Sequence, residues 1–368
     1  MSKIPILDLQ QEIQFLREKL FTAFEDVLQS GQFIMGPQVK ALESELAEFL
    51  GVKHAITLNS GTDALVIALR ALGIGERDEV ITTPFTFYAT AEAIQHVGAS
   101  TVFADIDPVT FNINVDSLEE KITNKTKAII PVHLFGQAVQ MDALMGLAKK
   151  YDLKIIEDVA QAFGGTFGDS MLGTIGDVGC FSFFPSKNLG AYGDGGLLTT
   201  NDDKVAEVAK MLRSHGSKKK YYNELVGYNS RLDEMQAAIL RVKLPYIQEW
   251  NGKRRKAASY YTAALKDVPG IATPEESPQC THVFHQYTIR VSDDQRELLK
   301  TYLEEQGIST MVYYPTPVHK LPIFSEIHES YSESEQAAAE VLSLPIWPNI
   351  QTEVQDQVIT AIKNFFKR

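Results

Sequence analysis

The regular alternation of apolar, strand-like segments with helical segments, from His54 to about Leu212, limits this chain to few folds. Such alternation is typical of a mostly parallel sheet covered by helices on both faces. Ligands of open sheets of this kind bind at the carboxyl ends of the strands, so polar residues just after a strand are the first candidates for function. The expected strands lie near 80–83, 101–104, 127–132, 154–157 and 178–184, with expected helices such as 90–97 and 142–150 between them.

The rest of the chain predicts a second, smaller domain. A helical stretch runs from Arg231 to about Asp267, and Pro245 is expected to bend or divide it. A length of 368 residues, 44% of them hydrophobic, suffices for two domains. We predict an N-terminal segment (1–30) packed on the small domain, a large domain (31–245) and a small α+β domain (246–368), the last with a strand at 283–291 and helices at 295–306 and 335–342.

Lys187 is the first candidate for covalent chemistry. It follows an apolar run that stops at Pro185, and four glycines follow before residue 197. Backbone of this kind can take unusual dihedral angles and hold a lysine amine away from bulk water. A lysine that is partly deprotonated in this way can form a Schiff base with a carbonyl compound. The alternative is a surface lysine in a glycine-rich turn.

A pair of carboxylates lies 29 residues earlier, at the end of the strand expected at 154–157. If that strand is half buried, Glu157 and Asp158 point to opposite faces, so only one of them can meet a ligand. We favour Asp158, which could hold a protonated ring nitrogen, and interpret Glu157 as a structural acid. Gln161 could reach an oxygen of the same ring, or be an ordinary exposed amide.

The segment from Asn59 to Leu65 predicts a strand end, a turn of small residues and a helix start. Unpaired amides at such a start bind phosphate, and Gly61 lets the backbone approach closely. A serine, glycine and threonine before a helix are also an ordinary cap. Ser182 could add a hydroxyl to the phosphate or be a strand residue facing solvent. Phe87 could stack on a ligand ring or belong to the core.

Together these segments resemble the sugar aminotransferase branch of the fold type I pyridoxal-phosphate enzymes, the DegT/DnrJ/EryC1/StrS family. The resemblance runs nearly from end to end, with six motifs in the family's order. They are GQFIMGP (31–37), NSGTDAL (59–65), EDVAQA (157–162), FSFFPSKNLGAYGDGG (181–196), GYNSRLD (227–233) and YPTPVH (314–319).

The resemblance implies a role for each residue of the expected cofactor site. Lys187 would bind pyridoxal 5′-phosphate covalently, Asp158 would hold its ring nitrogen, Gln161 would contact its phenolic oxygen, and Phe87 would stack on its ring. Gly61, Thr62 and Ser182 would hold the phosphate. Asn229 would reach the phosphate of the neighbouring subunit, which makes the functional unit a homodimer with shared sites. Phe163 stands where many members have histidine, a departure beside the ring.

Substrate contacts are less defined by the sequence. Lys219, in a basic and aromatic cluster at 218–222, could steer a nucleotide diphosphate or lie in a solvated loop. Arg231 could meet a substrate anion or pair with Asp233 or Glu234. The resemblance places Tyr314 and His319 in a stretch that lines the sugar pocket, and structural packing is the alternative for both.

The implied reaction transfers an amino group from L-glutamate to a nucleotide-linked keto-sugar in amino-sugar biosynthesis. Segments 3–9 and 229–233 look more like members that act at C3 of a dTDP- or UDP-linked 3-keto hexose than those that act at C4. One alternative is a sugar dehydratase of the same fold, although members that dehydrate by one known route carry histidine where this chain has Lys187. The other is a noncatalytic ligand sensor, which predicts a degraded cofactor site.

Composition excludes several other classes. A net charge of −12 argues against nucleic acid as the main partner. Cys180 and Cys280 cannot form a disulfide framework and have no partners at metal-ligand spacing, so we expect no metal site. Charge interrupts the N-terminus before a signal-type apolar region forms, and no segment approaches the ~20 apolar residues of a membrane helix. We therefore expect no membrane partner and a cytoplasmic location.

Overall fold

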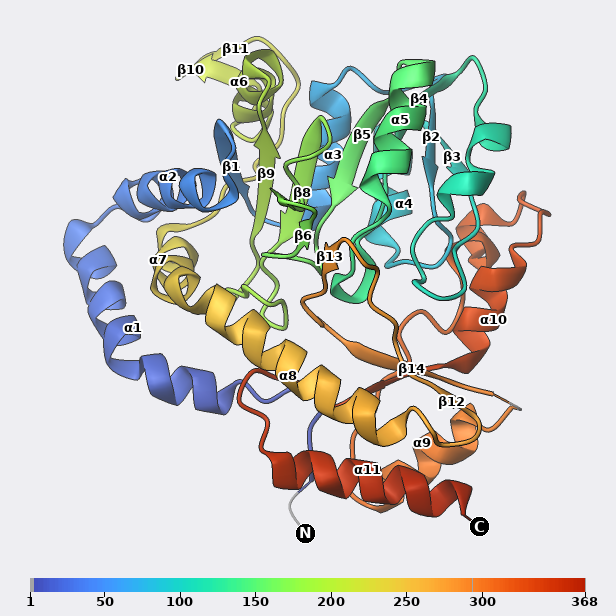
Figure 1. Cartoon of the computed structure of the whole chain (residues 1–368). Coiled ribbons are helices and arrows are strands. Elements are labelled where there is room, and N and C mark those ends of the chain that lie inside the picture. Colours follow the sequence, from blue (N-terminus) through green and yellow to red (C-terminus); the bar gives the residue numbers. More distant parts are fainter. Residues whose placement is uncertain (1–2, 293, 368) are drawn as a thin grey trace.

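A seven-stranded sheet lies at the centre of the computed structural model, which describes residues 3–292 and 294–367 (Figure 1). Residues 1, 2, 293 and 368, which fall in the predicted N-terminal and C-terminal segments, lie outside the described residues. The strand order is β1-β9-β8-β5-β4-β2-β3, and neighbours pair in parallel except for β9, which is antiparallel to β1 and β8. The strands are β1 (His54–Leu58), β2 (Glu79–Thr82), β3 (Ser100–Phe103), β4 (Thr126–Ile129), β5 (Lys154–Asp158), β8 (Val178–Ser182) and β9 (Gly196–Thr200).

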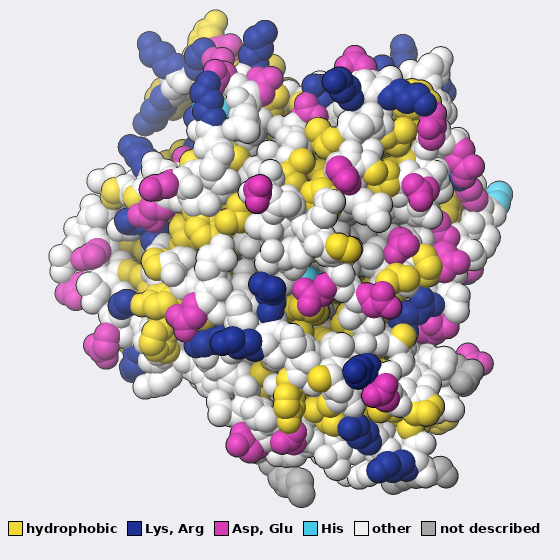
Figure 2. All heavy atoms as spheres, viewed as in Figure 1, with side chains coloured by type: hydrophobic (Ala, Val, Ile, Leu, Met, Phe, Trp, Pro, Cys, Tyr) yellow, Lys and Arg dark blue, Asp and Glu magenta, His cyan; other side chains and the backbone are white. Residues whose placement is uncertain are grey.

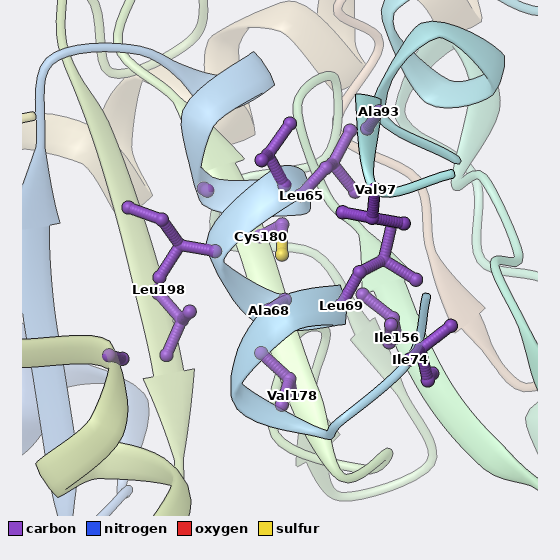
Figure 3. Close-up of a cluster of buried hydrophobic side chains, with 14 of the residues drawn as sticks. Leu65, Ala68, Leu69, Ile74, Ala93, Val97, Ile156, Val178, Cys180 and Leu198 are labelled. Carbon is purple, nitrogen blue, oxygen red and sulfur yellow. The ribbon is translucent and has the colours of Figure 1, made fainter. Parts of the chain in front are cut away.

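Helices cover both faces of this sheet because alternate residues of each strand point to opposite sides. Cys180 and Leu198 pack in a cluster with α3, α4 and α6 (Figure 3). Their neighbours Phe181 and Leu197 pack on the other face with α2 and α7, and Ile155 packs there with α5. The covering helices are α2 (Pro37–Leu50), α3 (Gly61–Ala71), α4 (Ala89–His96), α5 (Met141–Tyr151), α6 (Asp203–Leu212) and α7 (Glu234–Lys243).

The helical stretch after the sheet is divided at Pro245, as the sequence predicts. α7 gives way to a short 3-10 turn, η4 (Leu244–Tyr246), and then to the long α8 (Ile247–Leu265). Proline has no N–H to continue the hydrogen bonds of α7, so the chain starts a new helix.

The C-terminal part forms its own layer around a three-stranded antiparallel sheet. β14 (Tyr287–Val291) pairs with β12 (Ile271–Ala272) and β15 (Val341–Leu344). Its core cluster joins this sheet to α8, α9 and α11. The remaining elements of this part are α9 (Arg296–Glu305), α10 (Ser332–Glu340), α11 (Thr352–Phe366) and β13 (Cys280–Thr281), and β13 pairs with β6 (Thr166–Phe167), which pairs with β7 (Ser170–Met171).

The N-terminal segment contacts both parts of the molecule. Ile4 forms a parallel bridge with Ile308 and belongs to the C-terminal core cluster. α1 (Gln10–Ser30) instead packs through Leu16 and Leu20 on Ile239 of α7 and on Trp250. The segment therefore connects the C-terminal core to α7 and to the first turn of α8, with α1 on the outside of α7 (Figure 1).

The predicted fold class, a mostly parallel mixed sheet flanked by helices with a smaller α+β part, is confirmed. The antiparallel β9 makes the sheet mixed, and no crossover helix separates β8 from β9. One element boundary differs from the prediction. The predicted helix at 335–342 ends at Glu340, and residues 341 and 342 belong to β15, where β-branched Val341 and buried Leu342 favour the strand. Among the described residues, no helix combines the length and apolarity needed to cross a membrane.

Candidate active site

Four chain segments meet at one edge of the central sheet. β1 ends at Leu58, β5 ends at Asp158 and β8 ends at Ser182, while β9 starts at this edge with Gly196. Gly196 pairs with Leu58 on one side and with Ser182 on the other. The segments that the sequence singled out are therefore brought to the same edge, because their strands are neighbours in the sheet.

Asp158 is buried at the end of β5, with both carboxylate oxygens engaged. Thr90 Oγ1 donates a hydrogen bond of 2.9 Å to one oxygen, and the N–H of Ala160 donates one of 3.1 Å to the other. Burial raises the pKa of Asp158, while these two donors and the charge of Lys187 lower it. The sequence reasoning did not identify Thr90, although its position in the first turn of α4, the helix that follows β2, was a usable signal.

Glu157 points to the opposite face and holds a turn in place. Its carboxylate accepts hydrogen bonds of 2.8 Å from the N–H of Gly173, 2.8 Å from Ile175 and 2.7 Å from Gly176. His133 Nε2 lies 3.0 Å from the same carboxylate, and His133 Nδ1 accepts a bond from the N–H of Val139. Nδ1 therefore carries no proton, so the imidazole donates from Nε2, and Glu157 is fully used by structural donors.

Lys187 lies in the loop between β8 and β9, where its N–H donates to the carbonyl of Phe184 at 2.8 Å. Burial of the amine lowers the pKa of Lys187 to about 8, and the charge of Asp158 acts in the opposite direction. A far larger share of this amine is uncharged near neutral pH than for a solvated lysine. The amine is therefore suited to nucleophilic attack and to proton transfer.

The start of α3 provides unpaired backbone donors at the same edge of the sheet. Ser60 caps the helix by accepting a bond of 3.1 Å from the N–H of Asp63. Within the described part of the chain, no hydrogen bond occupies the N–H of Gly61 or Thr62. Ser182 packs against Gly61. Free amides at the positive end of a helix dipole form a site for an anion such as phosphate.

Gln161 has a fixed orientation. The N–H of Phe135 donates a hydrogen bond of 2.7 Å to Gln161 Oε1, and Gln161 Nε2 donates one of 2.5 Å to the hydroxyl oxygen of Tyr314. One N–H of the amide therefore remains for a ligand. Tyr314 comes from the C-terminal part, has a φ of 62°, and packs its ring on Phe85 and Phe135.

Phe87 has an exposed ring (62%), which excludes the core alternative for it.

Asn229 and Arg231 lie in the segment beside Asn59. Ser230 Oγ donates a bond of 2.8 Å to Asn59 Oδ1, and Asn229 bridges to Ser214. Among the described residues, Arg231 has no ion pair, and its buried Nε has no hydrogen-bond partner. Its two possible acidic partners are occupied elsewhere: Asp233 caps α7, and Glu234 accepts the amides of Gly36, Gln38 and Val39.

Two further candidates lie in different surroundings. Lys219 is exposed at the end of β10 (Ser217–Lys219), which pairs with β11 (Tyr222–Asn223) in a hairpin, and Lys and Arg side chains gather there at the upper left of Figure 2. His319 is buried against Phe103 and Tyr331 and lies 3.3 Å from Glu335. His319 is therefore part of a packed cluster, separate from the Gln161–Tyr314 contact.

Residues 14–363 match the DegT/DnrJ/EryC1/StrS aminotransferase family. The chain is 48% identical to a protein of Geobacillus stearothermophilus named pleiotropic regulatory protein, over 99% of each chain. It is 44% identical to the UDP-N-acetyl-3-dehydro-alpha-D-glucosamine 3-aminotransferase of Acidithiobacillus ferrooxidans, over 98% of each. The crystal structure of DesV from S. venezuelae in complex with a ketimine intermediate is similar with a TM-score of 0.97 and 40% identity, over 100% of each chain.

Proposed function

Because the chain belongs to the DegT/DnrJ/EryC1/StrS aminotransferase family, we propose that it is a pyridoxal-phosphate-dependent nucleotide-sugar aminotransferase. It moves an amino group from L-glutamate to a nucleotide-diphosphate-linked keto-sugar, at C3 of a dTDP- or UDP-linked 3-keto hexose. The observation that carries the proposal is that buried Asp158 lies at the same sheet edge as a lysine whose pKa burial lowers to about 8. A structural ion pair would instead stabilise the charged lysine.

The described residues fit this cofactor. The unpaired amides of Gly61 and Thr62 and the hydroxyl of Ser182 would hold its phosphate, at the start of α3. Asp158 would hold the ring nitrogen, Gln161 would donate its remaining N–H to the phenolic oxygen, and Phe87 would cover the ring. When bound, pyridoxal phosphate supplies an electron sink that stabilises negative charge on the donor Cα.

Lys187 performs two tasks in this scheme. Its uncharged amine would hold the cofactor, and once the amino donor had displaced it, the same amine would accept a proton from the donor Cα and return one to the amino-sugar carbon in the second half of the reaction. Asp158, held by Thr90 and Ala160, would keep the ring nitrogen protonated.

The choice of substrate rests on the relatives. The Acidithiobacillus protein is named for a 3-dehydro sugar linked to UDP, which supports action at C3. Arg231, whose possible partners Asp233 and Glu234 are engaged elsewhere, and exposed Lys219 would meet the diphosphate, and Tyr314 would face the sugar. The regulatory name of the Geobacillus relative does not favour a sensor here, because Lys187, Asp158 and the start of α3 are all retained.

We infer that the working unit is a homodimer in which Asn229 completes the site of the partner. The surface supports this: α1 and the following turn expose apolar side chains, namely Phe15, Phe21, Leu28, Phe33 and Ile34, each at least 48% accessible in the single chain. Apolar side chains gathered on one segment are typical of a protein interface. Both cysteines are free thiols, which suits a reducing cytoplasm.

The experiment that tests the function is a spectroscopic half-reaction. The visible absorbance of the protein loaded with pyridoxal phosphate is recorded, L-glutamate is added, and nucleotide-linked 3-keto and 4-keto sugars are then supplied in turn. Loss of the lysine-bound band with glutamate and its return with a 3-keto sugar is the expected result. Return only with a 4-keto sugar would change the assigned position. A band insensitive to every amino donor would favour a dehydratase or a sensor.

A further inference from the structure

Lys243, the last residue of α7, is buried outside the candidate site, with 1% of the residue exposed. Its ammonium donates a hydrogen bond to the carbonyl of Gly190, three residues after Lys187. It also forms an ion pair of 2.6 Å with Glu12 of α1. One buried side chain thus links the N-terminal helix to the loop that carries Lys187.

The loop is held at a second point by the same helix. Gln236 of α7 accepts a hydrogen bond of 2.9 Å from the N–H of Tyr192. The loop is also folded tightly on itself. The N–H of Ala191 donates a hydrogen bond of 2.7 Å to the carbonyl of Phe183. A Cβ atom at Gly190 would be only 2.5 Å from the carbonyl oxygen of Pro185. A displacement at Gly190 is therefore transmitted to Lys187 through a short, closely packed turn.

Glu12 is the group that favours the charged form of Lys243, against burial and the nearby charge of Arg254. Burial lowers the pKa of Lys243, and Glu12 opposes that shift. The centre of the Tyr192 ring lies 5.0 Å from the Lys243 ammonium, and the Tyr192 hydroxyl donates a hydrogen bond of 3.3 Å to Glu12. Arg254 of α8 adds a second buried positive charge, whose pKa burial lowers to about 10 while Glu12 opposes the shift. Glu12 is thus the acid that compensates both cations.

Stability alone does not account for this ion pair, because well-packed apolar residues of similar volume often replace buried pairs at no loss of stability. A direction-specific donor to a loop carbonyl has a different effect: it fixes where the backbone lies. We propose that Lys243, with Glu12 as its counter-ion, is a positioning residue that holds the loop so that the Lys187 amine is aimed at the cofactor aldehyde. This inference rests on the proposed function.

The step that depends on this aim is the anchoring reaction. The uncharged Lys187 nitrogen forms a carbon–nitrogen double bond with the aldehyde carbon of pyridoxal phosphate, and the aldehyde oxygen leaves as water with the two amine hydrogens. Lys243 touches neither the start of α3 nor Asp158, so it should govern the rate of this step and leave the prior binding of the phosphate unchanged. A misplacement of about 1 Å costs up to ~10²-fold in such a reaction.

The test uses the full-length protein freed of cofactor, with pyridoxal phosphate added at increasing concentration and the visible band followed in time. Saturation of the rate with concentration separates binding from bond formation. In Lys243→Met we expect the limiting rate to fall by about tenfold or more, with the half-saturating concentration unchanged within about twofold. Lys243→Arg should recover part of the rate. Arg241→Met removes the ion pair of α7 with Glu45 and serves as the matched control with a wild-type rate.

The outcomes separate the two proposals. A limiting rate in Lys243→Met equal to that of the wild type overturns the positioning role. If Lys243→Met does not fold, Glu12→Gln, which removes the counter-ion and keeps the shape, must show the same selective loss of rate, and a wild-type rate in that variant also overturns it. If the wild type itself forms no band, or Lys187→Ala forms the same band, the proposed function has failed instead.

Discussion

Gly61 packs against Ser182 with no room for a side chain between them, since a Cβ atom at position 61 would be 2.8 Å from Ser182 Cβ and 3.3 Å from the carbonyl oxygen of Phe181. The first turn of α3 is thereby pressed against the end of β8. This contact brings the free amides of the helix and the Ser182 hydroxyl to one place.

Gly61→Ala should therefore weaken the binding of pyridoxal phosphate, because the helix start must move away from Ser182. We expect the dissociation constant to rise by about tenfold or more, measured by equilibrium dialysis of the protein. Gly146→Ala is the matched control: a Cβ there meets nothing within 4 Å and lies in α5, so affinity should not change. Equal affinity in both variants would contradict the phosphate assignment.

Asp158→Asn should reduce multiple turnover by at least about a hundredfold, because an amide cannot stabilise a protonated ring nitrogen as a carboxylate does. Steady-state amino transfer is the measurement. Asp177→Asn, beside the start of β5, removes the charge that pairs with Lys154 and keeps an oxygen for the N–H of Ile155, so it should leave turnover unchanged. Comparable losses of turnover in the two variants would show that turnover depends on the integrity of β5 and not on a contact between Asp158 and the ring.

The rate at which Lys187 couples to added pyridoxal phosphate should depend on pH in a defined way. The reactive form is the uncharged amine, so the rate rises with pH and levels off above a pKa of about 8. In Asp158→Asn the plateau should begin at lower pH, because Asp158 raises the pKa of Lys187. A rate that still climbs above pH 10, as for a solvated lysine, would be incompatible with the buried amine.

Glu157→Gln should lower the free energy of unfolding and should have no direct effect on the reaction. The amide loses the charge that four donors satisfy, and its NH₂ would face an N–H group, at a cost of about 3 kcal/mol in the free energy of unfolding. Denaturant unfolding measures this. Glu119→Gln, which breaks the exposed contact with Lys150, should leave the transition midpoint in place. An unfolding curve for Glu157→Gln that overlays the wild type would exclude the structural role.

Mixing two inactive variants tests the shared site. If Asn229 serves the partner subunit, Lys187→Ala and Asn229→Ala dimers that exchange subunits should regain activity, since one of the two sites in a mixed dimer then has both residues intact. Amino transfer after mixing is measured beside each variant alone. No recovery, with exchange verified by differently tagged chains, would place Asn229 in its own subunit's site.

Sequence reasoning located Asp158 and Lys187 at strand ends because the apolar runs and their glycine-rich or polar ends are local signals. It also separated the two faces of β5, so that Glu157 and Asp158 could be told apart. Contacts between distant segments carry no such signal. The bond between Gln161 and Tyr314 spans 153 residues, and it depends on how the C-terminal part sits on the sheet.

The same limit explains Arg231 and Lys243. Arg231 has acids two and three residues on, and only the fold shows that Asp233 and Glu234 bind backbone amides. Lys243 has no acid within five residues, and its partner Glu12 comes from the N-terminal helix. The direction of β9 was likewise hidden, since an antiparallel strand after a loop has the same apolar pattern as a parallel strand after a helix.

The antiparallel course of β9 makes the candidate site a single cooperative unit. β1 and β8, which lead to the start of α3 and to the Lys187 loop, have no hydrogen bonds to each other; in the sheet both pair with β9, where Gly196 lies between Leu58 and Ser182. Separation of β9 from the sheet would remove the strand pairing of β1 and of β8 at the same time. A partly unfolded chain cannot keep the anion site while losing the lysine, or the reverse, so slow exchange of the β9 amide hydrogens should track retention of cofactor during unfolding.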